Sequence, residues 1–288
     1  MVFKALPAWM SLVFLLVVSA PLAKASDYQS PRTMGLGGAG HAAPLLNDAL
    51  YLNPSYTAFL PSYSLSFNYL WYGGGNANPD GSNSFHGHDI NAALQDGRSD
   101  LFQAGVGYTQ TETERMIHVG ASHQIIKQLG VGIGAKFNFP NDNSYSLIRD
   151  SIFSVTGAPA QWFQAAFIID NIFETDAGVS RGYYREFVLG TKFNVIGAVL
   201  IYFDPHFVPN YSTSYGHEFG IEFPLLHDFY LRGGLFQNAW IPFESARGRG
   251  WTYGAGWIGP RLSLDFGVSN PNAPIPATAF NIGGTAYF

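Results

Sequence analysis

Residues 63–71 read Tyr-Ser-Leu-Ser-Phe-Asn-Tyr-Leu-Trp, and this stretch decides the fold. Aromatic or aliphatic side chains occupy every odd position, while small polar residues occupy the even positions up to Asn68. A period of two predicts a β-strand with one apolar and one polar face. Such a strand fits a membrane barrel, in which one face contacts lipid and the other lines a polar lumen.

The same alternation returns along the chain, most clearly in 129–137, 262–269 and 278–288. Segmentation by this pattern predicts an all-β, antiparallel transmembrane barrel of about fourteen strands, each near the 9–11 residues needed to cross a membrane. Twelve strands remain the alternative, because 145–155 and 161–170 alternate least clearly. The predicted strands are 62–72, 85–95, 101–110, 115–125, 129–139, 145–155, 161–170, 184–194, 196–204, 214–224, 228–238, 250–258, 261–269 and 278–288.

Composition supports the same class of protein. Charged residues make up only 12% of the chain and aromatic residues 16%, whereas soluble domains carry about 25% charged residues. Mean hydropathy is close to zero, below that of a helical membrane protein. The 288 residues include no cysteine, which excludes disulfides and thiolate metal sites. The net charge is −5, and no basic patch is present, so we expect no nucleic-acid partner.

The N-terminus has the features of an export signal. Lys4 precedes an apolar run over 9–20, and Ala23-Lys24-Ala25 places small residues at both positions that signal peptidase reads. The alternative, a membrane anchor, needs roughly 20 apolar residues, more than this run offers. We expect cleavage after Ala25. The chain then divides into a signal peptide (1–25), an N-terminal segment (26–60) and an outer-membrane barrel (61–288).

The predicted connections suggest an orientation in a bacterial outer membrane. Such barrels have short periplasmic turns and longer outside loops, and an even strand number places both termini in the periplasm. Aromatic residues near predicted strand ends are expected to form girdles at the membrane surfaces, namely Tyr72, Tyr108, Trp162, Trp240, Trp251 and Trp257. The final Tyr287-Phe288 resembles the terminal aromatic signature by which the barrel assembly machinery recognises outer-membrane proteins.

The N-terminal segment carries a second resemblance. A glycine-rich run with Gly35, Gly37, Gly38 and Gly40 is followed by an acidic-alanine element at Asp48 and then by Asn53-Pro54-Ser55. This arrangement resembles the FadL-type barrels, transporters of long-chain fatty acids and other hydrophobic compounds, in which alanine follows the Asn-Pro pair. The resemblance implies that 26–60 forms a hatch inside the lumen, with Asn53 and Pro54 shaping its end near the first strand. The predicted outside loops are too short for the extended capture groove of the fatty acid transporters.

Charged side chains follow the phase of the predicted strands. A charge that faces lipid at the membrane centre costs about 2–4 kcal/mol for Arg or Lys, so charges are expected in the lumen. Buried charges usually need partners, and we therefore expect a paired network that joins barrel and hatch, with a polar path as the alternative. The predicted lumen-facing charges are Lys136, Glu186, Lys192, Glu218, Glu222, Arg232 and Asp265.

Other motifs indicate no catalytic site. The spacing from Gly35 to Gly40 fits a dinucleotide fingerprint, but neither the preceding strand nor the cytosolic context is present. His86, His88 and Asp89 lack a further metal ligand, so a solvated strand end is favoured. No nucleophile–base pair stands out. We expect no enzyme activity, no metal and no cofactor.

Three functions remain open. The first is passive transport of small hydrophobic compounds through a hatch-gated lumen. The second is a structural or accessory role in secretion or surface assembly. The third, an enzyme inside the lumen, is not excluded by a barrel fold. A continuous apolar tunnel favours transport, whereas a plugged lumen favours the accessory role. Substrate, partner proteins and oligomeric state are beyond what the sequence predicts.

Overall fold

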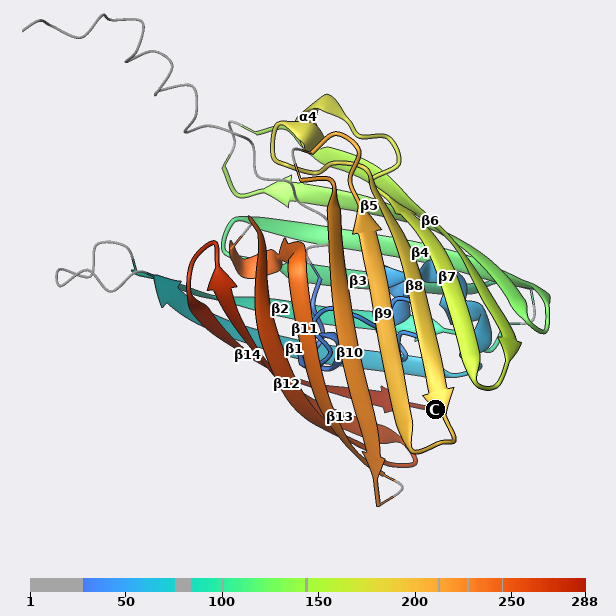
Figure 1. Cartoon of the computed structure of the whole chain (residues 1–288). Helices are drawn as coiled ribbons and strands as arrows, with labels where there is room; N and C mark the ends of the chain where they lie inside the picture. The colour runs from blue at the N-terminus through green and yellow to red at the C-terminus, as the bar shows by residue number, and fades with distance from the viewer. Residues whose placement is uncertain are drawn as a thin grey trace, which may run out of the picture.

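A computed structural model describes residues 28–288, apart from 76–83, 100, 143, 144, 212, 227 and 245. Fourteen antiparallel strands form one closed barrel, in which each strand pairs with its neighbours in sequence (Figure 1). The predicted count of fourteen is confirmed, and the alternative of twelve is wrong. The signal peptide, expected over 1–25, lies outside the described residues. The strands are β1 (Tyr63–Gly75), β2 (Ser84–Asp96), β3 (Gln103–Gln110), β4 (Glu114–Ile126), β5 (Leu129–Pro140), β6 (Ile148–Ala160), β7 (Phe163–Asp170), β8 (Glu186–Val195), β9 (Val199–Phe207), β10 (Tyr215–Leu225), β11 (Phe229–Ile241), β12 (Ala246–Ile258), β13 (Leu262–Ala273) and β14 (Ala277–Tyr287).

The barrel closes where β1 pairs with β14. The register sets Ser64 opposite Tyr287 and Trp71 opposite Phe280. Beyond this ladder, the amide of Phe288 donates to the carbonyl of Tyr63 at 2.9 Å. Closure removes both sheet edges, so each wall strand finds partners on both sides, as hydrocarbon surroundings require.

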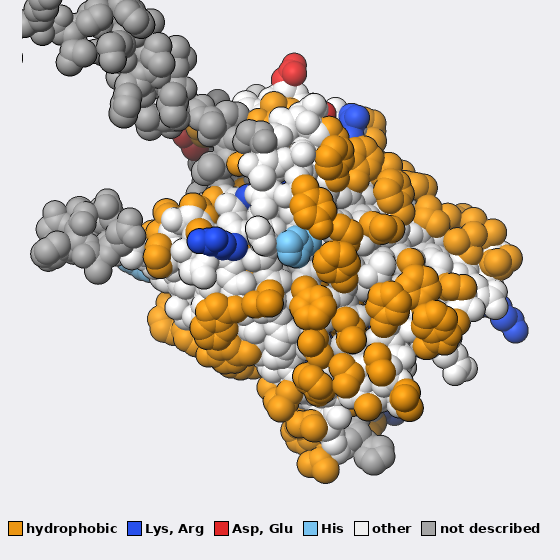
Figure 2. Space-filling view, in the orientation of Figure 1, with side chains coloured by type: hydrophobic (Ala, Val, Ile, Leu, Met, Phe, Trp, Pro, Cys, Tyr) orange, Lys and Arg blue, Asp and Glu red, His pale blue; other side chains and the backbone are white. Residues whose placement is uncertain are grey.

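The outer surface of the wall is apolar. On β1 the odd positions are exposed, with Phe67 at 54% and Trp71 at 58%, whereas the polar Ser64 and Ser66 point inward and are buried. Figure 2 shows apolar side chains spread over the face formed by neighbouring strands. An apolar exterior over a polar interior is the arrangement of a barrel that spans a membrane. Among the described residues, no helix is long and apolar enough to cross a membrane.

The predicted aromatic girdle is only partly correct. Trp162 and Trp251 are well exposed. Tyr72, however, is buried on the inward face of β1, and Trp240 is buried at the end of β11, where three consecutive residues beyond a β-bulge are buried. Their prediction as lipid-facing residues is wrong, because proximity to a strand end does not reveal the face on which a residue lies.

The two edges of the barrel differ in the length of their connections. At the edge where β1 begins and β14 ends, the turns include 127–128, 196–198 and 259–261. The opposite edge carries the longest connection, 171–185, which contains α4 (Asp176–Val179), together with short ones such as 111–113 and 274–276. This asymmetry is typical of outer-membrane barrels, which have short turns on the periplasmic side and longer loops outside.

Residues 28–60, hereafter the luminal segment, lie inside the wall (Figure 1). The segment contains α2 (Pro31–Gly35), α3 (Asp48–Leu52) and the 3₁₀-helix η1 (Pro54–Phe59). α2 packs against β11–β14, and η1 packs against β3–β6 on another part of the wall. The segment therefore crosses the lumen from one side to the other.

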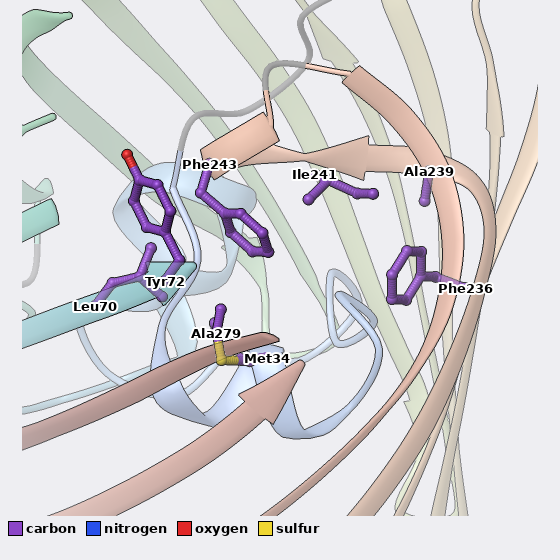
Figure 3. Close-up of a cluster of buried hydrophobic side chains, with 8 residues drawn as sticks. All are labelled: Met34, Leu70, Tyr72, Phe236, Ala239, Ile241, Phe243 and Ala279. Atoms are coloured by element: carbon purple, nitrogen blue, oxygen red, sulfur yellow. The ribbon is translucent and has the colours of Figure 1, made fainter. Parts of the chain in front are cut away.

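A connection at the longer-loop edge also turns inward. It contains η2 (Pro242–Glu244), whose Phe243 stacks on Tyr72 of β1 with ring centroids 5.1 Å apart. These two rings join a buried apolar cluster with Met34 of α2 and Ile241 of β11 (Figure 3). The cluster thus brings the luminal segment, the wall and an outer connection together.

Candidate functional site

Asn53 and Ser55 fasten the luminal segment to the wall. The side-chain amide of Asn53 donates to the His41 carbonyl and to Thr156 Oγ1 of β6, both at 2.7 Å. The backbone amide of Ser55 donates to Ser154 Oγ at 2.8 Å, and the Ser55 hydroxyl oxygen lies 2.7 Å from the hydroxyl oxygen of Thr156. Serine, which stands where the resembling barrels carry alanine, thus adds a hydroxyl contact that alanine cannot make. Pro54 begins η1, where its missing amide proton costs nothing.

Asp48 organises the start of the segment. Its carboxylate accepts hydrogen bonds from the hydroxyl of Tyr28 and, at 2.7 Å, from that of Ser30. Ser30 also caps α2 by accepting from the amide of Thr33 at 3.1 Å. Burial raises the pKa of the Asp48 carboxyl to about 6, even though both hydroxyls favour its ionised form. The group therefore titrates close to neutral pH.

The glycine-rich run lets the segment approach the wall. Gly37, Gly38 and Gly40 have φ values of 72°, 92° and 124°, which side-chain-bearing residues rarely adopt. A Cβ on Gly38 would lie 2.3 Å from Glu218 Oε1. Gly35 lies against β12, where its Cβ would come within 3.1 Å of the Gly254 backbone. These glycines serve close backbone packing, in line with the rejection of a nucleotide site.

One group of charges, hereafter the arginine cluster, joins α2 to the wall. Arg32 Nε lies 3.3 Å from Glu222 Oε2, and Arg232 Nε lies 2.6 Å from the same oxygen. Arg232 also reaches Asp265 Oδ1 at 2.5 Å, while Arg32 donates to the Tyr202 hydroxyl at 2.8 Å. Two cations thus face two carboxylates, and the cluster is electrically balanced.

A second group, hereafter the histidine cluster, surrounds His41. Asp204 Oδ2 accepts from the amides of Gly40 and His41 at 2.7 and 2.8 Å, and lies 2.9 Å from His41 Nδ1. On the neighbouring wall, His206 Nδ1 lies 3.1 Å from Glu186 Oε1, and His206 Nε2 lies 3.2 Å from Glu218 Oε2. Arg247 pairs with the same oxygen of Glu186.

The luminal segment divides the interior into separate spaces. A cavity of about 330 Å³ lies at the edge where β1 begins, between the segment and β12–β14, and its lining includes Pro31, Leu45 and Leu46. A smaller cavity of about 50 Å³ lies beyond the segment, beside His41, His206 and Trp240. Neither of these two cavities joins the two edges of the barrel.

All seven predicted luminal charges lie on inward positions of their strands. Glu222, Arg232 and Asp265 meet in the arginine cluster, and Glu186 and Glu218 in the histidine cluster. Lys136 pairs with Asp170 at 2.5 Å. Lys192 is in none of the ion pairs found among the described residues. Of His86, His88 and Asp89, the two histidines are exposed, and Asp89 points inward on the other face of β2.

Several residues of these clusters were not predicted. The period-two pattern places Asp204 and His206 on one face of β9, so it could have found them. Arg32 and His41 lie outside any strand, where no periodicity exists to reveal which way they point.

These features define a class: a closed transmembrane β-barrel whose lumen is occupied by its own N-terminal segment. Three solved structures of similar fold bear on the type of barrel. The CymD monoaromatic hydrocarbon channel has a TM-score of 0.64 at 11% identity, with 90% of this chain and 97% of that chain covered. The Ralstonia pickettii toluene transporter TbuX gives 0.60 at 11%, covering 91% and 98%. A Pseudomonas aeruginosa FadL homologue gives 0.64 at 10%, covering 93% and 99%.

The chain is therefore a FadL-like barrel in fold, as its N-terminal motif led us to expect. At these identities the likeness concerns the fold alone. No family model matches the sequence. No curated protein matches it either.

Proposed function

We propose that this protein is an outer-membrane channel that admits small hydrophobic compounds by passive diffusion when its luminal segment shifts. The observation that carries the proposal is the FadL-like barrel with a separate segment held in the lumen by polar contacts. In the proposed orientation in the outer membrane, the edge with the shorter turns and both termini face the periplasm. Tyr287-Phe288 would be the part that the barrel assembly machinery recognises.

The cavity beside the segment supports this function. It measures about 330 Å³ and lies near the start of β1 and the end of β14, whereas a cavity of about 150 Å³ is enough to hold benzene. A monoaromatic compound, the class named for two of the similar channels, is therefore small enough for it. In the proposed channel this cavity is the inner half of the path, and the luminal segment lies across the rest.

The test is entry of 1-N-phenylnaphthylamine, an apolar fluorophore, into vesicles with lipopolysaccharide in their outer leaflet. Lipopolysaccharide slows apolar solutes, so a channel is expected to raise the entry rate several-fold over vesicles without protein. Barrel folding is checked in parallel by the shift in gel mobility on boiling. A folded barrel that leaves the entry rate at the level of empty vesicles would sink the proposal.

A closed lumen favours one other function. The segment is tied to the wall by two clusters of buried charges, and a permanently closed barrel would serve as an accessory to secretion or surface assembly. Such a barrel would show no fluorophore entry and would co-purify with a surface-exported partner after cross-linking in cells. An enzyme inside the lumen has no comparable support from the site.

A further inference from the structure

The histidine cluster has an arrangement that the proposed transport function does not need. His41, His206 and Glu218 each offer one ligand atom, and these atoms lie within 4.8 Å of one another at buried positions. Two of them, His206 Nε2 and Glu218 Oε2, are 3.2 Å apart. The separation between two ligand atoms of a tetrahedral zinc site, with bonds of about 2.0–2.2 Å, is about 3.3 Å.

Two of the candidate ligand atoms face each other. His206 Nε2 and Glu218 Oε2 are buried and lie 3.2 Å apart as an ion pair, with no further hydrogen bond from the described residues. A bound ion would replace this direct contact with one coordination bond to each atom. The Nδ1 of His206 faces Glu186 at 3.1 Å. A carboxylate at that position fixes the tautomer of a metal-binding histidine, leaving its other nitrogen free to coordinate.

The charge balance points the same way. With the imidazoles neutral, the form in which they coordinate a metal, the cluster contains the carboxylates of Glu186, Glu218 and Asp204 against the single guanidinium of Arg247. This excess of two negative charges is buried, where unpaired charge is costly. The arginine cluster, by contrast, is balanced. A divalent cation would neutralise the histidine cluster completely.

We propose that His41, His206 and Glu218 bind one divalent transition-metal ion, with zinc as the reference ion. Two imidazoles and one carboxylate are a ligand set that proteins use for zinc. Asp204 and Glu186 hold the two rings in place. The adjoining cavity of about 50 Å³ has room for a water at the fourth position, since one water needs about 10–15 Å³. The ion would join the luminal segment, through His41, to β9 and β10.

The test uses the full chain, without a histidine tag, stripped with EDTA in detergent and titrated with Zn²⁺ alone. We expect one zinc per chain. His206→Gln and Glu218→Gln should weaken binding at least about 100-fold, and Glu186→Gln about 10–100-fold, as for other groups that orient ligands. His118→Gln, a buried luminal histidine outside the cluster, and His88→Gln, an exposed one beside Glu112, are matched controls and should leave affinity unchanged.

Two results would overturn the proposal. One is a stripped wild-type barrel that binds no zinc, which would mean that protonated imidazoles balance the carboxylates instead. The other is unchanged affinity in His206→Gln or Glu218→Gln. If these variants do not fold, X-ray absorption of the zinc-loaded wild type decides. Two imidazole nitrogens and a carboxylate oxygen around zinc support the site, and a spectrum without imidazole contradicts it.

Discussion

The guanidinium of Arg232 on β11 is fully buried and contacts Glu222 on the neighbouring β10 and Asp265 on β13, two strands away. Arg232→Met would leave Asp265 without its partner inside the lumen. Removal of one member of a buried ion pair costs about 3–5 kcal/mol, so the free energy of unfolding should fall by that amount in urea titrations in lipid. The control is Arg98→Met, which breaks an exposed pair with Asp96 and should cost less than about 1 kcal/mol. Equal losses in the two variants would contradict the buried network.

Asp48 gives the luminal segment a pH dependence of defined sign. Burial raises the pKa of its carboxyl from 3.8 to about 6, so the folded chain holds a proton that the unfolded chain releases. The contribution of this group is greatest below its unfolded pKa and is lost as pH rises through about 6. Relative to Asp48→Asn, the wild type should lose about 3 kcal/mol of its free energy of unfolding between about pH 3 and about pH 7.

The measurement is the free energy of unfolding of both proteins at several pH values. Asp228→Asn, at an exposed turn position, is the control and should run parallel to the wild type. The pKa of Asp48 is not raised if the free energies of unfolding of the wild type and Asp48→Asn differ by the same amount at every pH. It is not raised either if the wild type gains stability over Asp48→Asn as pH rises.

At the scale of elements, the strands were predictable and the luminal contacts were not. Strand β1 shows its period within nine residues, because neighbouring side chains face lipid and lumen in turn. Register and closure follow from pairing between successive strands. The partners of Arg32 and His41 on the barrel wall, Glu222 and Asp204, in contrast, lie more than 150 positions away along the chain. Only the folded wall brings these residues together, so a local pattern carries no information about them.

The fit between η1 and the wall depends on a glycine face of β5. A Cβ at Gly132 would lie 2.2 Å from the Ser55 amide nitrogen. Gly132→Leu should therefore push η1 off the wall while leaving the strand pairing intact. We expect faster hydrogen exchange over 55–59 and faster fluorophore entry than in the wild type. Gly233→Leu is the control, since nothing lies within 4 Å of its Cβ. Unchanged exchange in Gly132→Leu would contradict the packing described for η1.

For the whole molecule, the wall and the segment differ in how they are held. Every described strand pairs with two neighbours in a closed ladder, and opening it would expose many backbone groups to hydrocarbon. The segment is held instead by side-chain hydrogen bonds and ion pairs, such as those of Asn53 and Arg32. If the barrel opens as proposed, movement of the segment within a fixed wall is therefore the change of lowest cost.

A disulfide that locks the segment tests whether it moves. The hydroxyl oxygens of Ser55 and Thr156 lie 2.7 Å apart, near the S–S bond length of about 2.05 Å, and the chain contains no cysteine that could compete. Ser55→Cys with Thr156→Cys should admit the fluorophore when reduced and exclude it when oxidised. Asn91→Cys with Thr109→Cys links two wall strands at directly opposed positions and should admit it in both states. The disulfide restricts the segment and leaves the wall as it was. If the fluorophore enters the oxidised, locked barrel as fast as it enters the dithiol form, passage does not require the segment to move.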